Sequence, residues 1–297
     1  MWFKNARVYR FSDTFQLPED FESQLEAQAF KPCGRQDMTS FGWTSVFGAQ
    51  SDVLHHAVEQ SYLVCAQREE KVLPAAVINA ELEQKVQAIQ DTEGRPVNGK
   101  EKKNIKEDIT HQLLPQAFSK FRRTWAYIDL KRQLVIVDES SANKAEDLLG
   151  LLRASLGSLP VKPIALAESA EVVLTEWLTK QSLPTRFDLG DELELRSPQA
   201  DGGIIRCKQE DLTREDVQAH ATAGKQVVKL GLVWNERIEC VLEADWALKR
   251  IKATDQLLDD QDDWNDASPE QKLDSDLALV SAELGALLDD LLSMSAK

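Results

Sequence analysis

The chain has 297 residues, with 50 acidic and 35 basic side chains, a formal net charge of −15 and an isoelectric point near 4.8. Apolar residues make up 42% and charged residues 29%, a globular composition that excludes collagen-like and coiled-coil proteins. No run of about 18 apolar residues exists, so no transmembrane helix is expected, and the first residues lack the pattern of a secretory signal. An acidic balance argues against nucleic acid unless the charge is segregated along the chain.

The charge is in fact segregated. Residues 95–132 carry ten basic and four acidic side chains, whereas residues 255–297 carry twelve acidic and two basic ones. A basic patch beside an acidic remainder suits a protein that binds DNA in one place and avoids it elsewhere, although two solvated helix faces without a partner would show the same pattern. Four cysteines are widely spaced, which indicates reduced, cytosolic thiols rather than a disulfide framework or a zinc site.

The periodicity predicts alternating strands and helices in the first half of the chain. Residues 3–11 alternate as a strand, and a helix follows Pro18. Residues 30–43 contain Pro and Gly and are expected to form a loop, and 62–66 a short strand. Apolar stripes at 78–89 and 105–113, separated by a Gly/Pro/Asn turn, predict a helical hairpin.

The remaining segments predict a sheet with packed helices. Strands are expected at 125–130, 133–138, 161–166, 193–197, 203–208, 227–234, 238–243 and 248–254, and helices at 143–156, 170–180 and 275–294. Few strand–helix–strand units appear, so we expect an α+β fold with mainly antiparallel sheets and a projecting helical hairpin. The expected domains are a central α+β domain (1–73 with 117–168), the helical hairpin (74–116) and a second α+β domain with an acidic C-terminal helix (169–297).

Motifs for common enzyme chemistry are not found in the sequence. It has no P-loop, no GxGxxG, no GxSxG and no HExxH. The acidic group Asp259, Asp260, Asp262 and Asp263 is the one enzyme-like constellation, because paired aspartates can hold Mg²⁺ for phosphodiester cleavage. It lacks the spacing of a calcium loop and lies in a polar segment, so a solvated loop is the favoured interpretation. We expect no catalytic residue, no metal site and no cofactor.

Two further features are candidates for contacts with partners. Arg206 and Lys208 occupy alternate positions of a predicted strand and therefore share one of its faces, as phosphate ligands or as a solvent-facing pair. Phe118 and Phe121 flank Lys120 near the end of the predicted hairpin. They are core residues by default, but if exposed they would anchor a protein–protein contact.

Taken together, eight segments resemble the bacterial recombination-associated protein family RdgC. In chain order they are MWFKNARVYR, FKPCGRQDM, CAQREEKVLPAAVI, LLPQAF, LLRASLGSLPV, LTEW, DGGIIRCKQEDLT and LKRIK. No one segment is decisive, but their joint order over nearly the whole chain is specific. The resemblance implies a non-enzymatic protein of the cytoplasm or nucleoid. Such a protein binds double-stranded DNA with little sequence preference, forms a ring-like homodimer around it and restrains recombinase activity.

The basic residues and this resemblance together define an expected DNA-binding set. Its members are Lys100, Lys102, Lys103, Lys106, Lys120, Arg122, Arg123, Arg206 and Lys208, with Phe118 as the expected dimer contact. Two other functions stay open: an inhibitor whose acidic tail binds the recombinase directly, and, less favoured, the Mg²⁺-dependent phosphodiesterase.

Overall fold

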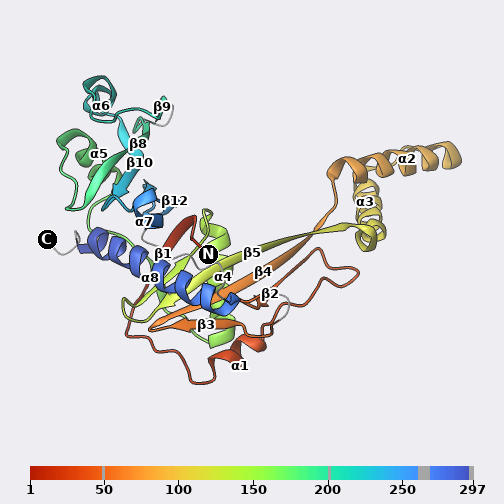
Figure 1. Cartoon of the computed structure of the whole chain (residues 1–297). Coiled ribbons are helices and arrows are strands. Elements are labelled where there is room, and N and C mark those ends of the chain that lie inside the picture. Colours follow the sequence, from red (N-terminus) through yellow and green to blue (C-terminus); the bar gives the residue numbers. More distant parts are fainter. Residues whose placement is uncertain (49–50, 200–201, 260–267, 294–297) are drawn as a thin grey trace.

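The computed structural model describes residues 1–48, 51–199, 202–259 and 268–293 (Figure 1). The strands are β1 Asn5–Phe11, β2 Thr39–Thr44, β3 His55–Val58, β4 Ser61–Val72, β5 Phe118–Asp129, β6 Leu134–Val137, β7 Val161–Pro163, β8 Phe187–Arg196, β9 Ile204–Lys208, β10 Gln226–Trp234, β11 Ile238–Glu243 and β12 Leu248–Ala253. The helices are α1 Phe21–Glu26, α2 Ala75–Glu93, α3 Gly99–Leu113, α4 Ala142–Leu156, α5 Ala170–Lys180, α6 Glu215–Thr222, α7 Asp255–Asp259 and α8 Pro269–Ser293, with a 3₁₀ turn Leu114–Gln116.

The strands form one open sheet in the order β2-β4-β5-β6-β1-β12-β11-β10-β8-β9, with β3 beside β4 and β7 beside β1. Every pair of these strands is antiparallel. Strand β1 joins the two halves, because Asn5 and Ala6 pair with β12 while Arg7 to Arg10 pair with β6. The α+β class with antiparallel pairing is therefore confirmed.

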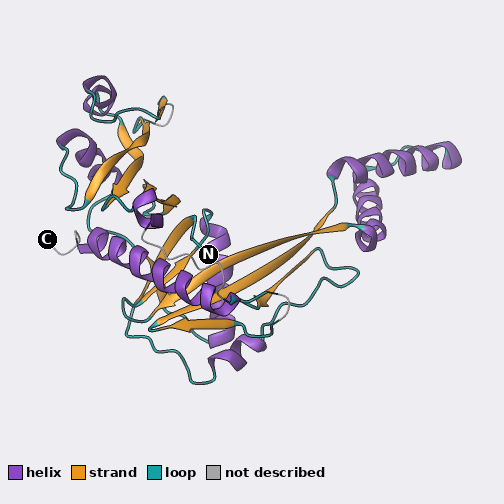
Figure 2. Cartoon of the chain, in the orientation of Figure 1, coloured by secondary structure: helices purple, strands orange, loops and turns teal. Residues whose placement is uncertain are grey.

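Helices cover the two faces of the sheet unequally (Figure 2). On one face, α5, α6, α7 and α8 pack in a single apolar cluster against strands of both halves. On the other face, α1 and α4 pack against β1, β2 and β4–β6 in a second cluster. The apolar stripe of α4 produces this contact, since Ala145, Leu148, Leu149 and Leu152 are buried, and Gly157 ends the helix at a φ of 73° that favours glycine.

Helix α8 is held to the sheet by its leucines and by ion pairs around the buried Asp129. Arg132 binds Asp129 and Asp289, at 2.9 Å each, and Asp129 is 1% exposed. The guanidinium of Arg132 lies against Gly285 of α8, and a Cβ atom on this residue would overlap the guanidinium. Arg132 therefore positions helix α8 against the sheet.

The arm, defined as residues 75–116, stands away from the rest of the chain at the far end of β4 and β5 (Figure 1). Helices α2 and α3 contact each other, and Asn98 caps α3 by accepting a hydrogen bond from the Glu101 amide at 2.9 Å. Ile109 of α3 is buried, whereas α2 buries no residue. The arm thus has little core of its own.

Most elements expected from the sequence are present, but several segments differ. The segment 30–43, expected as a loop, contains most of β2. The backbone of Phe30 lies so close to Gly42 of this strand that a Cβ atom on Gly42 would overlap it. Strands β4 and β5 are twelve residues each, much longer than expected, because their outer ends are rich in charged residues and show no apolar alternation. The helix α6 and the strand β3 were not expected. All four cysteines are free. Among the described residues, none of the helices combines the length and the apolar composition of a membrane span.

Candidate nucleic-acid interface

The face of β8–β12 opposite α5 and α8 has no helix packed on it among the described residues. Side chains that point away from the apolar cluster therefore reach the surface here, and we call this surface the open face. Because side chains alternate between the two faces of a strand, every second residue lies on the open face. In β9 these exposed residues are Ile204, Arg206 and Lys208. The expectation that Arg206 and Lys208 share a face is confirmed.

Charged side chains on the open face form a connected network. Glu194 of β8 accepts hydrogen bonds from Arg196 at 2.6 Å and from Arg206 at 2.8 Å, and lies 3.7 Å from the Lys229 ammonium. Glu243 of β11 lies 3.1 Å from Lys229 and 2.6 Å from Lys249. The register of the strands brings these groups together, since Glu194 is paired with Arg206 and with Lys229, and Lys229 with Glu243. Four cations thus surround two carboxylates.

The pKa of Glu194 reflects this network. Burial of the side chain raises the pKa, but hydrogen bonds from Arg206 and Arg196 and the charge of Lys229 outweigh it and lower the pKa from 4.5 to about 2. The carboxylate is therefore ionised throughout the neutral range and holds its cations there.

A titration followed by NMR of the Glu194 side-chain carboxyl carbon should show a midpoint near pH 2. Because the pKa is depressed in the folded state, the network stabilises the fold above about pH 4.5 and loses that contribution as the pH falls toward 2. A midpoint at 4.5 or above would contradict the network.

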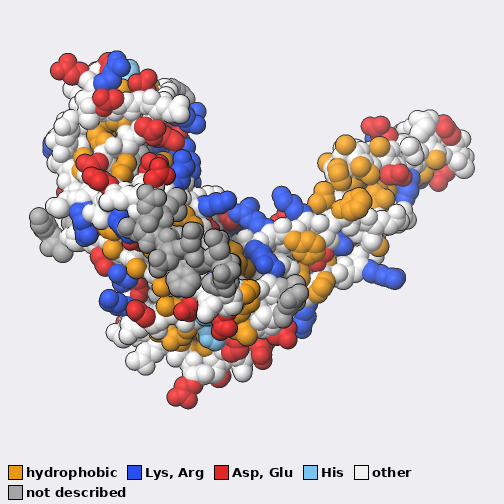
Figure 3. Space-filling model, in the orientation of Figure 1, with side chains coloured by type: hydrophobic (Ala, Val, Ile, Leu, Met, Phe, Trp, Pro, Cys, Tyr) orange, Lys and Arg blue, Asp and Glu red, His pale blue; other side chains and the backbone are white. Residues whose placement is uncertain are grey.

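The open face belongs to a concave surface. Figure 3 shows Lys and Arg side chains along the inner curve between the lobe of β8–β10 and the arm. Beside α4, over β2, β4 and β5, a small cavity of about 50 Å³ is lined by the cations Lys120, Arg122, Arg68 and Lys144 and by Glu70. Arg122 pairs with the buried Glu139, and Arg68 stacks on Phe41 at 4.3 Å. Cations therefore occur over the β4–β5 ribbon as well as on the open face.

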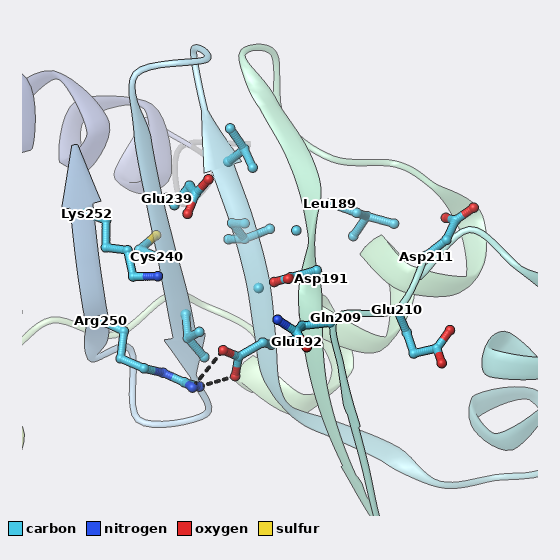
Figure 4. Close-up of a pocket in the computed structure, with 15 residues that line it drawn as sticks. Leu189, Asp191, Glu192, Gln209, Glu210, Asp211, Glu239, Cys240, Arg250 and Lys252 are labelled. Carbon is cyan, nitrogen blue, oxygen red and sulfur yellow. Dashed lines mark hydrogen bonds and ion pairs between the residues drawn. The ribbon is translucent and has the colours of Figure 1, made fainter. Parts of the chain in front are cut away.

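The open face also has an acidic part. This part is a hollow of about 680 Å³ over β8, β10, β11 and β12 (Figure 4). Its lining contains only two cations, Arg250 and Lys252, among the described residues. Five carboxylates share this lining: Asp191, Glu192, Glu210, Asp211 and Glu239. Arg250 is bound by Glu192 at 2.7 Å. Carboxylates therefore outnumber cations in the lining of this hollow.

The structure divides the predicted DNA-binding set into separate groups. Lys100, Lys102, Lys103 and Lys106 are exposed on α3 in the arm, and Lys103 lies 3.8 Å from Glu107. Lys120 and Arg122 point to the α4 side of β5, whereas alternation places Arg123 on the opposite face, where its guanidinium contacts Gln67 at 3.3 Å. Arg206 and Lys208 lie on the open face. The set is not one contiguous cluster.

Several cations at these sites were not expected from the sequence: Arg68, Lys144, Arg196, Lys229, Lys249 and Arg250. A signal for some of them exists, because Lys229 interrupts an apolar strand and LKRIK places three cations within β12. Their convergence depends on strand order, which local patterns do not give.

The aromatic pair near the arm is exposed rather than part of the core. Phe118 is 86% and Phe121 is 56% exposed, and Val72 and Val77 are exposed nearby in the sequence of β4 and α2. Val72 is paired with Phe118 across β4 and β5, so these two side chains form one apolar surface. Such a surface suits a protein contact.

The acidic group considered for metal binding lies mostly outside the described residues. Asp260, Asp262 and Asp263 are not described, and Asp259 is described only as the last residue of α7. Within the described ranges, no group of three or more His, Cys, Asp or Glu side chains is arranged to hold a metal ion.

Comparison with known proteins agrees with the resemblance drawn from the sequence. Residues 1–295 match the family model described as "Putative exonuclease, RdgC". The chain is 46% identical over 289 residues to the recombination-associated protein RdgC of Aeromonas hydrophila, covering 97% of this chain and 95% of that one. It is 45% identical over 293 residues to the protein of the same name from Yersinia pestis, covering 98% and 97%. The chain therefore belongs to the RdgC family of recombination-associated proteins.

Proposed function

We propose that this protein binds double-stranded DNA without sequence preference and that the inner curve is its DNA-binding surface. The supporting observation is the open face, where exposed cations lie on a surface that no helix covers among the described residues. Duplex DNA carries one negative charge per about 1.7 Å of its axis, and phosphate contacts carry no sequence information. No described helix with base-reading side chains is needed for such binding.

We further propose that two copies close around the duplex. One chain forms an open arc (Figure 3), so a closed path needs a second arc. The exposed Phe118 at the base of the arm is the proposed contact between the two copies. A closed dimer that occupies duplex would restrain a recombinase by competition for DNA, and the acidic outer surface would keep DNA on the inner side. The proposed location is the cytoplasm and nucleoid.

The other two functions make different predictions. A direct recombinase-binding inhibitor would use the acidic C-terminal region, and the two proteins would bind each other when DNA is absent. The family model's description as an exonuclease names a third function, a Mg²⁺-dependent phosphodiesterase. We propose that the protein is not an enzyme and needs no cofactor, and an assay with labelled duplex and Mg²⁺ should leave the DNA intact.

The binding proposal is tested with two unrelated 30-base-pair duplexes in a salt series. We expect equal dissociation constants for the two sequences. With about six to ten phosphate contacts per dimer, the affinity should fall by roughly 10³–10⁵ between 50 and 200 mM salt. Lys102, Lys103 and Lys106 changed together to Glu should weaken binding; unchanged affinity and salt slope would remove α3 from the interface. A strong preference between the duplexes would contradict sequence-independent binding.

A further inference from the structure

We propose that Glu194 and Glu243 limit the affinity of the open face for duplex DNA by offsetting the charge of the cations above them. This inference rests on the proposed function and adds a determinant of its strength. These two carboxylates lie on the proposed DNA-binding surface and lower its affinity for DNA.

The carboxylates lie beneath the cations. The side chain of Glu194 is 6% exposed and that of Glu243 is 15% exposed, whereas Arg196 and Arg206 are 51% and 62% exposed. Lys229 lies between the two carboxylates, 3.7 Å from one and 3.1 Å from the other. A phosphate approaching this surface therefore meets the cations first and the carboxylates behind them.

The cations remain able to bind phosphate. Arg206 donates its Nε–H to Glu194, and within the described ranges its two terminal nitrogens donate no hydrogen bond. A guanidinium has five N–H donors, so those nitrogens are available to a phosphate oxygen. Lys229 and Lys249 likewise have three donors each. Glu194 thus occupies Nε and Nη2 of Arg196 and Nε of Arg206, and it reduces the charge of the surface while the other donors of these side chains remain.

The reduction in charge has a specific thermodynamic effect. Four cations with two carboxylates carry a net charge of about +2 instead of +4, so fewer counterions are exchanged when phosphates bind. A carboxylate shielded from solvent is screened by salt much less than an exposed one. Its repulsion of a phosphate therefore persists at physiological salt, when much of the attraction from the exposed Arg196 and Arg206 is screened.

An alternative role for the same residues is purely structural. If Glu194 served only to hold Arg196, Arg206 and Lys229 in place, removing its charge would disorder these side chains and weaken DNA binding. The two roles predict opposite changes in affinity, and an isosteric substitution separates them.

The test uses the full chain with Glu194→Gln and Glu243→Gln, each measured by fluorescence anisotropy with a 30-base-pair duplex over a salt series. We expect each variant to bind roughly threefold to tenfold more tightly at 150 mM salt. Because a dimer loses two carboxylates, the salt slope should become steeper by up to about two. The matched control is Glu283→Gln, which removes a carboxylate paired with Arg237 at 2.8 Å on α8, on the opposite side of the sheet. Its affinity should equal that of the unaltered protein.

Each outcome decides the proposal. Unchanged or weaker binding by the Glu194→Gln variant overturns it and leaves the proposed function intact, provided that the unaltered protein binds duplex. Failure of the unaltered protein to bind duplex overturns both. Equal tightening by the Glu283→Gln control would show an effect of total charge and also overturns the proposal. If Glu194→Gln does not fold, as judged by thermal unfolding, Glu243→Gln decides alone.

Discussion

Replacing Phe118 by Asp is expected to convert the proposed dimer into a monomer. Phe118 is 86% exposed in the single chain and lies beside Val72 on the same surface of the β4–β5 ribbon. A buried aromatic anchor at an interface contributes about 2 kcal/mol or more, and an unpaired carboxylate in its place adds a desolvation penalty. The dissociation constant of the dimer should therefore rise by at least about 100-fold.

Light scattering at micromolar concentration measures this change directly. The molar mass should fall from about twice to about once the chain mass of 33.4 kDa. The matched control is Val172→Asp, which replaces another exposed apolar side chain, 43% exposed on α5, and should leave the mass unchanged. A dimer that survives the change at Phe118 would show that the copies meet elsewhere.

Removing Arg206 and Lys208 together, as alanines, is expected to weaken DNA binding and to make it less sensitive to salt. Each copy loses two cations on the open face, so a dimer loses up to four phosphate contacts. The slope of log affinity against log salt should become shallower by roughly 3.6, and affinity at low salt should fall about tenfold to 100-fold. Glu194 keeps Arg196 and Lys229 as partners, so the fold should persist.

The control removes an equal charge from α5 and α6, which pack on the face of the sheet opposite the open face. Lys180 on α5 and Arg214 at the start of α6 are 63% and 56% exposed, and each pairs with a neighbouring carboxylate. Their joint replacement by Ala should change the salt slope much less. Equal losses in the two double variants would mean that overall charge, and not the open face, governs binding.

Much of the fold could be predicted because local patterns determine it. The leucine stripe of α4 with Gly157 after it, and the alternation in β10 and β11, are strong local signals. The outer half of β5 was missed because Phe118 to Arg123 are all at or near the surface, so no apolar alternation marks the strand. Pairing with β4 stabilises this segment, and that partner is distant in sequence.

The candidate site was predictable only in part. Arg206 and Lys208 could be placed on one face because a strand alternates with a period of two. Their relation to Lys229 and Lys249 depends on the order β12-β11-β10-β8-β9, which the sequence does not give. The two faces of β5 separate Arg122 from Arg123, and a basic run in the sequence conceals that separation. The charge distribution along the sequence therefore indicates the basic segment 95–132, but it does not indicate the surface on which cations from distant strands lie together.

Retention on covalently closed circular DNA tests the central claim most directly. The protein is bound to circular and to linear duplex of the same sequence at low salt, and then challenged with about 0.5 M salt, at which phosphate contacts are strongly weakened. A closed dimer around the duplex predicts that protein remains on the circle and is released when a single cut linearises it. Equal release from circular and linear DNA would contradict encirclement.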